Sequence, residues 1–233
     1  MLVKEIDNVT KIESNRRFET SDRVINDAFI NIIVDGKPLI NLYYSPESTE
    51  ALVYGHLLAE KIISSKDDVK SLKIDQGTNI AEVTLFPGTN HSVKPNRNPN
   101  YVCKASDIMA AAEKFIPGSE NFRDTGALHS AALCKGSDLL YFNEDLSRHC
   151  AIDKILGMGL LNDIDLSQCY IMTSGRLPSD MFDKIVAAGI PAIVSRSAPS
   201  KKTVEMAKKY NTIVCGFVRA NRMNIYNGSE RII

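Results

Sequence analysis

The sequence QCYIMTSGRLPSDMFDKIVAAGIPAIVSRSAP, from Gln168 to Pro199, contains the alternation of elements that decides the fold class. Apolar runs at 168–173 and 192–195 predict two strands, and the segment 179–188 predicts a helix between them. The same alternation extends outward, with helices expected at 125–136, 150–158 and 200–210 and strands at 139–142 and 212–217. Strands that alternate with helices indicate an α/β fold with a largely parallel sheet.

The first hundred residues predict a different, antiparallel arrangement. Two apolar runs between Arg23 and Tyr44 flank Asp35-Gly36, which is a strong signal for a β-hairpin. A long loop rich in Pro and Asn ends near Tyr101, and so long a connection in a compact domain is often functional. The other elements expected here are a helix at 48–63, strands at 69–74 and 80–86, and a helix from Ser106 that Pro117-Gly118 closes. We therefore divide the chain into an N-terminal α+β subdomain, residues 20–100, and an α/β domain, residues 101–233.

Composition excludes several classes of protein. The 233 residues are 44% hydrophobic and carry 28 basic and 28 acidic side chains, so no global field attracts nucleic acid or an acidic membrane. No stretch approaches a signal peptide or a membrane span, and we expect a cytoplasmic protein. The five cysteines form no CxxC pair, which argues against a disulfide framework or a zinc site. Cys134, Cys169 and Cys215 adjoin apolar runs and are interpreted as buried hydrophobes.

Arginines follow the expected strands of the second half. The strand ends read TSGR, SRSAP and GFVRANR, and they bring Arg176, Arg196, Arg219 and Arg222 toward one edge of the sheet. Ligands of α/β sheets bind at the carboxyl ends of the strands, and arginine supplies planar donors for phosphate. Any one of these arginines alone is more simply an exposed loop residue. The set predicts a site for a phosphate-bearing ligand.

Two further segments could carry chemistry. FNEDLSRHCAIDKILG, Phe142 to Gly157, places Asp145, His149 and Asp153 at i,i+4 spacing, either as a functional cluster or as a salt-bridged surface helix capped by Asn143. Cys103 precedes the helix that starts near Ser106 and adjoins Lys104, a setting that favours a thiolate. The alternative is an accessible but chemically idle thiol.

These segments resemble the FdhD family, the formate dehydrogenase accessory proteins that act as sulfur carriers for the molybdenum cofactor. EDLSRHCAIDK is similar to the family segment ED-x-GRHNA-x-DK, with Ser147 in place of Gly and Cys150 in place of Asn. TGALHSAAL, the block Thr173 to Pro199 and GFVRANRMNIYNGSERI resemble further family blocks in the same order. Cys103 aligns with the second cysteine of the family's CG-x-CGKAS stretch, whereas Asn100 stands at the first and the following Gly is missing.

The resemblance implies a fold and a function. The fold is α/β, with a cytidine-deaminase-like three-layer core and an N-terminal hairpin and helix, assembled as a homodimer. The function is to accept sulfur from a cysteine desulfurase at Cys103 and pass it to the bis-molybdopterin guanine dinucleotide cofactor of a formate dehydrogenase. The chain would hold this cofactor as cargo; whether it counts as an enzyme of the sulfurtransferase kind stays open. The cofactor-binding residues implied are Arg148, His149, Arg176, Arg196, Phe217, Val218, Arg219, Ala220, Asn221 and Arg222.

The same resemblance argues against a bound metal. Zinc deaminases need H-x-E and P-C-x-x-C, but Ala131 stands at the Glu position after His129, and no P-C-x-x-C occurs. We interpret His129 as a hydrogen-bonded residue of an apolar helix and assign no role to His56 or His91. Two other functions stay open: a cofactor-binding chaperone or divergent paralogue without a persulfide relay, and an unrelated nucleotide-binding protein.

Overall fold

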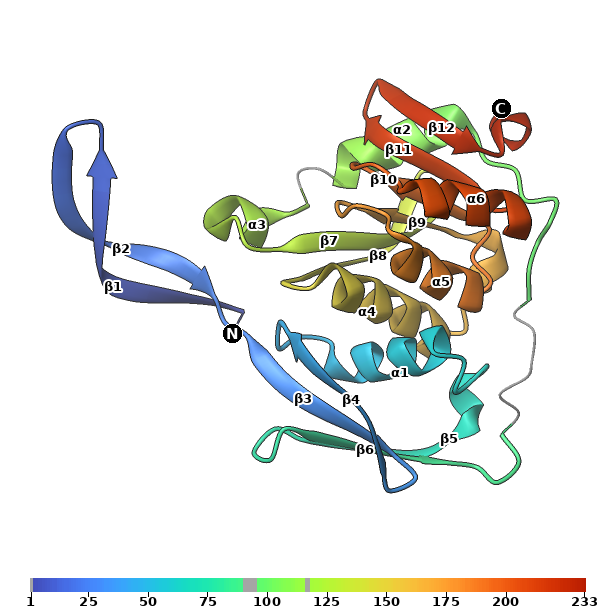
Figure 1. The fold of residues 1–233 in the computed structure, drawn as a ribbon, viewed down its shortest axis with the longest axis horizontal. Helices are drawn as coiled ribbons and strands as arrows, with labels where there is room; N and C mark the ends of the chain where they lie inside the picture. The colour runs from blue at the N-terminus through green and yellow to red at the C-terminus, as the bar shows by residue number, and fades with distance from the viewer. Residues whose placement is uncertain (1, 90–95, 116–117) are drawn as a thin grey trace.

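A six-stranded sheet forms the centre of the chain in the computed structural model, which describes residues 2–89, 96–115 and 118–233 (Figure 1). The strand order is β12-β11-β10-β9-β7-β8, and β9, β10 and β11 run parallel. The strands are β7 (His129–Lys135), β8 (Asp138–Asp145), β9 (Tyr170–Thr173), β10 (Ala192–Ser195), β11 (Ile213–Arg219) and β12 (Arg222–Asn227). The α/β class is therefore confirmed.

The prediction of a largely parallel sheet was wrong for its outer strands. β7 and β8 are joined by a tight turn at Gly136, and β11 and β12 by a turn after Arg219, so both pairs are antiparallel. β7 also pairs antiparallel with β9. Short connections of this kind can join only antiparallel neighbours, because a parallel pair needs a crossover of a dozen or more residues.

One predicted helix, residues 125–136, is a strand. The segment divides into a short helix α3 (Glu120–Thr125) and strand β7, in which Ser130 to Cys134 are all buried. A run of small apolar residues fits a buried helix and a buried central strand equally well, and periodicity cannot separate the two. Because β7 lies between β8 and β9 with both of its faces covered, the strand forms.

Helices cover both faces of the six-stranded sheet, as Figure 1 shows. Helix α2 (Ala105–Phe115) packs on one face, with Ile108, Ala112 and Phe115 in contact with a cluster that includes residues of β7, β9, β10 and β11. The other face is covered by α4 (Arg148–Leu161), α5 (Ser179–Ala187) and α6 (Lys201–Tyr210). This arrangement is a three-layer α/β/α core; its likeness to cytidine deaminases stays a prediction.

A second sheet, of four strands, completes the body of the molecule. Its order is β4-β3-β6-β5, and its β3–β4 hairpin turns at Asp35-Gly36 as predicted, with φ of 47° and 74°. The elements are β3 (Ala28–Val34), β4 (Lys37–Tyr44), α1 (Thr49–Ala59), the 3₁₀ turn η1 (Lys66–Asp68), β5 (Val69–Asp75) and β6 (Ile80–Leu85). One apolar cluster joins this sheet, α1 and the α4–α5 layer, and the division into two domains near residue 100 stays a prediction.

Two glycines set the distance between α1 and α4. A Cβ atom placed on Gly55 would lie 1.7 Å from the carbonyl oxygen of Asp153, and one on Gly157 would lie 1.8 Å from that of Ala51. The two helix backbones are therefore in direct contact, and no side chain fits between them. This contact holds the four-stranded sheet and α1 against the main core.

Residues 3–25 form an arm that the sequence did not predict. β1 (Val3–Glu13) and β2 (Arg16–Ile25) pair as a two-stranded hairpin that projects from the body (Figure 1). Arg23 of the arm forms an ion pair with Asp124 of α3, and most of the hairpin's other residues are exposed. The predicted N-terminal subdomain began at residue 20, inside β2.

Two sequence predictions fall on residues 90–95 and 116–117, which lie outside the described residues: the polar loop with His91, and the closing Pro117. Across the described ranges, no helix is both long and apolar enough to cross a membrane.

Candidate anion-binding site

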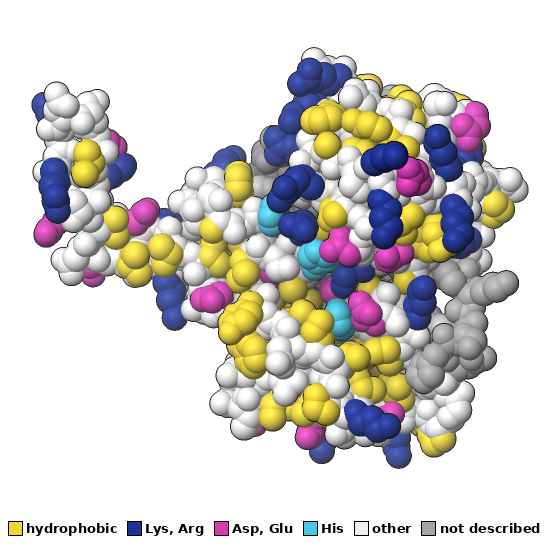
Figure 2. Space-filling model, in the orientation of Figure 1, with side chains coloured by type: hydrophobic (Ala, Val, Ile, Leu, Met, Phe, Trp, Pro, Cys, Tyr) yellow, Lys and Arg dark blue, Asp and Glu magenta, His cyan; other side chains and the backbone are white. Residues whose placement is uncertain are grey.

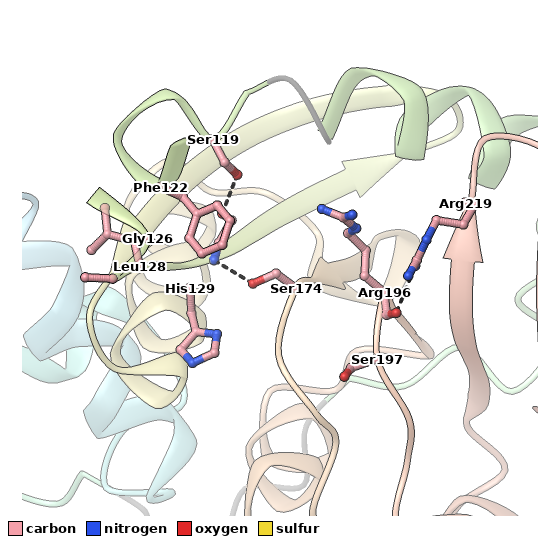
Figure 3. A pocket seen from close by; sticks show the side chains of 11 residues that line it. Ser119, Phe122, Gly126, Leu128, His129, Ser174, Arg196, Ser197 and Arg219 are labelled. Carbon is pink, nitrogen blue, oxygen red and sulfur yellow. Dashed lines mark hydrogen bonds between the residues drawn. The ribbon is translucent and has the colours of Figure 1, made fainter. Parts of the chain in front are cut away.

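A cavity of about 440 Å³ opens at the carboxyl edge of β9, β10 and β11, beside the start of β7 (Figure 3). Figure 3 shows Phe122 and His129 on one side of the cavity and the side chains of Arg196 and Arg219 on the other. The lining residues are Ser119, Phe122, Gly126, Ala127, Leu128, His129, Ser130, Ser174, Arg196, Ser197 and Arg219. Two of the arginines predicted at strand ends are thus brought together.

Hydrogen bonds fix the walls of this cavity. The Ser130 N–H donates to Ser174 Oγ at 2.9 Å, and the hydroxyls of Ser119 and Ser130 lie 2.6 Å apart. Arg219 Nη1 donates to the carbonyl oxygens of Arg196 (2.9 Å) and Val218 (2.8 Å), which joins the ends of β10 and β11. Only one of its guanidinium nitrogens is used in this way, so Arg219 keeps donors for a ligand.

The cavity is cationic, because Arg196 and Arg219 line it and none of the described residues that line it is acidic. Arg196 Nε is buried and has no hydrogen-bond partner among the described residues. Burial and the neighbouring charge of Arg219 lower the pKa of Arg196, and burial together with the charges of Arg148 and Arg176 lowers the pKa of His129. Unpaired buried donors of one sign favour an anionic ligand, since an anion would satisfy the donors and offset the repulsion.

Phe217, which does not itself line the cavity, lies in β11 two residues before Arg219 and has a strained backbone conformation. Its φ is 53°, its side chain is 43% exposed, and a bulge in β11 interrupts the pairing with β12 between Gly216 and Arg219. The Phe217 N–H donates to the carbonyl oxygen of Ser197 at 3.1 Å, which ties the bulge to the cavity wall. A bulky residue at positive φ is rare and concentrates at functional sites. An exposed aromatic ring beside arginines can stack against a planar base.

Four other residues of the predicted binding run 217–222 do not line the cavity. Val218 is 1% exposed, so its side chain belongs to the core. Ala220 and Asn221 form the β11–β12 turn and Arg222 begins β12, and none of the three lines the cavity. The sequence prediction treated this run as one binding surface. The strand alternation and the turn separate it into contributing and non-contributing residues.

Arg148 and Arg176 line a second cavity, of about 340 Å³, with Leu177, Pro178, Ala198, Pro199 and Ser200. Neither arginine has an ion pair or a side-chain hydrogen bond in the part of the chain that the structure describes, and Arg148 Nε is buried without a partner. His149, which was predicted to bind the cofactor together with these arginines, pairs through Nε2 with Asp180 at 3.6 Å. Because both arginine charges reach His129, the two cavities share one electrostatic environment.

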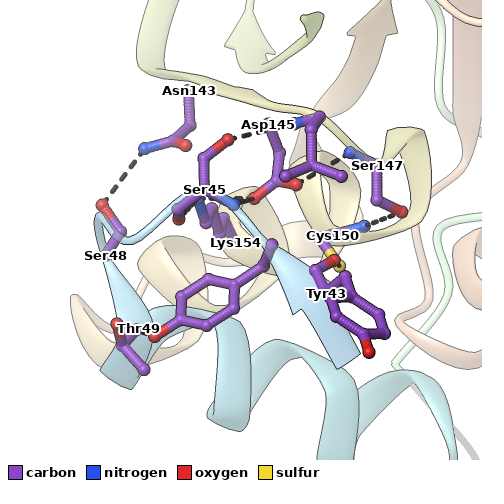
Figure 4. A network of polar contacts seen from close by, with 11 residues as sticks. Tyr43, Ser45, Ser48, Thr49, Asn143, Asp145, Ser147, Cys150 and Lys154 are labelled. Atoms are coloured by element: carbon purple, nitrogen blue, oxygen red, sulfur yellow. Dashed lines mark hydrogen bonds and ion pairs between the residues drawn. The ribbon is translucent and has the colours of Figure 1, made fainter. Parts of the chain in front are cut away.

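The polar segment Phe142 to Gly157 is a structural network and not an exposed helix face. Asp145 ends β8 and contacts Lys154 Nζ at 2.7 Å, and Ser147, not Asn143, caps α4 by accepting from Cys150 (Figure 4). The predicted i,i+4 pairs of His149 with Asp145 and Asp153 are absent, because Asp145 lies outside the helix and the Asp153 carboxylate contacts Lys184 and His56 instead.

Asp153 forms the second part of this network. Both of its carboxylate oxygens accept from Lys184 Nζ at 2.7 Å, and Oδ2 also contacts His56 Nδ1 at 3.0 Å. His56, to which the sequence assigned no role, is thus a structural partner of Asp153. Cys150 is buried at the same place, with Sγ 3.7 Å from the carbonyl oxygen of Tyr43, and burial raises its thiol pKa to about 12.

Cys103 lies at the opposite edge of the sheet from the arginines. It bridges Ile232 near the amino ends of β9 and β11 and lines a separate cavity of about 500 Å³ with Tyr101, Lys104 and Gln168. The predicted thiolate setting was wrong for the free chain: Cys103 is 8% exposed, and burial raises its thiol pKa to about 11. The nearby start of α2 and Lys104 do not overcome this desolvation.

No three His, Cys, Asp or Glu side chains gather as metal ligands within the described ranges. His129, the histidine at the motif position, stands beside arginine charges instead, an environment that disfavours a cation. The expectation that the chain binds no metal stays a prediction.

Comparison with known proteins agrees with the fold and with the motifs. The model of the FdhD/NarQ family matches residues 25–97 and 86–233. The chain belongs to the FdhD/NarQ family. It is 32% identical to sulfur carrier protein FdhD of Methanothermobacter thermautotrophicus, over 100% of this chain and 99% of that protein, and 29% identical to sulfur carrier protein FdhD of Bacillus subtilis, over 99% and 98%.

The fold is shared with a solved structure. A Desulfotalea psychrophila protein, provisionally described as a formate dehydrogenase accessory protein, superposes with a TM-score of 0.87 over the full length of both chains at 24% identity. At that identity the likeness concerns the fold alone.

Proposed function

We propose that this FdhD/NarQ member is a sulfur carrier that binds the bis-molybdopterin guanine dinucleotide cofactor and sulfurates it before insertion into a formate dehydrogenase. The observation that carries the proposal is the cavity at the carboxyl edge, where Arg196 and Arg219 have unused donors and none of the described lining residues is acidic. The names of the relatives supply the sulfur-carrier part of the proposal. The cofactor is the substrate here, not a resident group.

In this proposal the arginines bind the pyrophosphate of a guanine nucleotide arm. Guanidinium groups pair with phosphate oxygens in a fork, and such charge-assisted bonds are the strong ones. The exposed ring of Phe217 would stack on the guanine base beside them. Burial and the nearby charges of Arg148 and Arg176 lower the pKa of His129, which favours the neutral imidazole, so it can accept or donate a hydrogen bond without adding charge. Arg148 and Arg176 would hold a further anionic part of the cofactor.

Cys103 would accept sulfur from a cysteine desulfurase, and we expect the protein to work in the cytoplasm as a homodimer. A second candidate function is a cofactor-binding chaperone without a relay. It is favoured by two facts about one place: Asn100 replaces the first cysteine of the family pair, and Cys103 is buried with a raised thiol pKa.

Calorimetry with GDP tests the nucleotide site. Replacing Arg196 or Arg219 by Ala should weaken GDP by about 1.5–3 kcal/mol each, roughly 10- to 100-fold in Kd. Arg17→Ala, an exposed arginine on the hairpin arm, is the matched control and should bind as the wild type does. Arg222→Ala separates the strand-end prediction from the cavity, since Arg222 lies outside the lining. Equal affinities for all four variants would refute the site.

A sulfur-transfer assay separates the two candidate functions. Incubation with a cysteine desulfurase and cysteine should add one sulfur mass to the peptide that contains Cys103, and Cys103→Ala should abolish the adduct while GDP binding persists. Absence of any adduct, with intact GDP binding, would leave the chaperone as the function. An adduct on Cys150 would contradict the assignment of Cys103.

A further inference from the structure

Arg231 is a buried cation with unused donors. It ends the short turn η3 (Ser229–Arg231), is 8% exposed, and its Nη1 and Nη2 atoms are buried with no hydrogen-bond partner among the described residues. Its one ion pair, from Nε to Glu230 at 3.3 Å, goes to a carboxylate whose side chain is 69% exposed. Leaving two donors of a charged group unsatisfied in the interior is unfavourable, and an anion beside them would satisfy them.

One group on the adjacent segment that can become an anion is the thiol of Cys103. The Cys103 N–H donates to the carbonyl oxygen of Arg231 at 3.1 Å, and Cys103 in turn accepts from the Ile233 N–H at 3.0 Å. These backbone bonds hold the two residues on adjacent segments. The charge of Arg231 lowers the pKa of the Cys103 thiol, against the larger upward effect of burial.

We propose that Arg231 is a positioning residue that stabilises the sulfur anion of Cys103, first as the thiolate and then as the persulfide. The inference rests on the proposed function only in taking Cys103 as the sulfur acceptor. It explains how a chain with Asn100 at the other cysteine position could carry sulfur on one thiol: a cation, instead of a second thiol, protects the bound sulfur. The cavity of about 500 Å³ beside Cys103 gives room for the added atom.

The chemical step is an exchange with no external oxidant. The Cys103 thiolate attacks the terminal sulfur of a donor persulfide, and the donor's S–S bond breaks. The donor leaves as a thiolate and takes up the proton that Cys103 lost, while Cys103 keeps the sulfur as a persulfide. A persulfide retains a negative terminal sulfur at neutral pH more readily than a thiol does, so a fixed guanidinium stabilises the product as well as the nucleophile.

Other groups lie around Cys103, but none of them supplies a positive charge that acts on its thiol as Arg231 does. Asp107, at the first turn of α2, raises its pKa. Neutral groups coupled to it are the phenols of Tyr101 and Tyr170 and the thiol of Cys215. Lys104 and Lys135 line the same cavity, on the segment before α2 and at the end of β7. Within this set, Arg231 is the cation whose charge acts directly on the thiol.

The test is the pH profile of Cys103 alkylation by iodoacetamide, followed by peptide mass spectrometry on the full chain. Arg231→Met should lower the rate at pH 8 by about tenfold, because losing an adjacent opposite charge moves a pKa by about one unit or more. Arg231→Lys should lie between, since it keeps the charge and loses the fork. Arg17→Met on the arm is the control and should leave the profile unchanged.

A merely structural Arg231 predicts the opposite sign. If Arg231 only held the segment in place, its loss would expose Cys103 and alkylation would become faster, which would overturn the proposal, as would an unchanged rate. Glu230→Gln covers the case in which Arg231→Met does not fold. It alters an exposed side chain and frees Arg231 from its competing carboxylate, so alkylation should become about two- to fivefold faster. An unchanged or slower rate in Glu230→Gln would also count against the proposal.

Loading with inorganic polysulfide separates this inference from the proposed function. The wild-type chain should hold one added sulfur on Cys103, and Arg231→Met should lose it at least several-fold faster. If polysulfide loads Cys103 in an Arg231-dependent way while a cysteine desulfurase does not, the role of Arg231 stands and the proposed sulfur source fails. If retention does not depend on Arg231, the inference fails whatever the desulfurase does.

Discussion

The two buried aspartates beside helix α4 each contact a cation, whereas the arginines at the carboxyl edge of the main sheet form no ion pair among the described residues. Asp145 pairs with Lys154, and Asp153 pairs with both Lys184 and His56. In contrast, Arg148, Arg176, Arg196 and Arg222 make no ion pair with any residue that the structure describes. Figure 2 shows Lys and Arg side chains exposed near histidines on this side of the molecule. Charges that the chain itself neutralises support the fold, and charges that it leaves open are available to a ligand.

Removing one partner of the buried ion pairs at α4 should have the largest effect on the free energy of unfolding. Asp153→Ala leaves Lys184 and His56 buried without their common partner, and removing one member of a buried pair destabilises by about 3–5 kcal/mol. Urea unfolding monitored by circular dichroism measures this loss. Glu205→Ala, which removes the exposed partner of Lys201, is the control and should stay within about 0.5 kcal/mol of the wild type. A small loss in Asp153→Ala would remove the distinction between the two regions.

The pH dependence of the free energy of unfolding tests the same Asp153 contacts. The Lys184 and His56 contacts hold the pKa of Asp153 below its usual value, despite burial. Its contribution is therefore complete above the unfolded pKa of about 3.9 and is lost as pH falls through the lower folded pKa. In Asp153→Asn the free energy of unfolding should fall less steeply below about pH 4 than in the wild type. Parallel acid limbs for both proteins would contradict this assignment.

Removing the unpaired set should affect ligand binding but hardly affect folding. The double variant Arg196→Ala/Arg219→Ala relieves like-charge repulsion and loses two carbonyl contacts, so we expect a change within about 1 kcal/mol without ligand. With saturating GDP, the wild type should gain thermal stability and the double variant should not. A large loss of stability in the ligand-free variant would make these arginines structural.

The smallest effect is expected at His129. Burial and the charges of Arg148 and Arg176 lower its pKa, so the imidazole is neutral at pH 7. A bound pyrophosphate offsets those charges and should raise the pKa of His129, which NMR titration of its ring protons can follow. The same titration in Arg196→Ala/Arg219→Ala is the control, because that variant should not bind the anion and the pKa of His129 should not respond to GDP. An unchanged pKa for His129 would place the anion elsewhere.

Sequence patterns predicted the features that depend on residues close together in the chain. The hairpin at Asp35-Gly36, the strands of the second half and the arginines at their ends are all local signals, and the structure has them. The patterns failed for features that depend on contacts between residues far apart in the chain. β7 is a strand because both of its neighbours pair with it, and Asp145 meets Lys154 because β8 ends beside α4.

Sequence patterns also could not show how deeply individual side chains are buried. The thiol of Cys103 has a cation and a helix start next to it in sequence, but the bridge to Ile232 hides it from water, and no sequence window shows this contact. Arg231 escaped notice for the same reason, because its unpaired donors are evident only once its surroundings are known. Gly55 and Gly157 could have been singled out as small residues on two helices, yet only the packing of α1 on α4 shows why a Cβ is excluded.

The β1–β2 arm also affects how the assembly state of this protein should be measured. An 11-residue strand spans roughly 36 Å, so the arm extends the molecule well beyond the radius of its core. In gel filtration a chain of this shape elutes earlier than a compact protein of 25.8 kDa and can be mistaken for a dimer. Light scattering or native mass spectrometry, which report mass independently of shape, are therefore the measurements from which a monomer and a homodimer can be told apart.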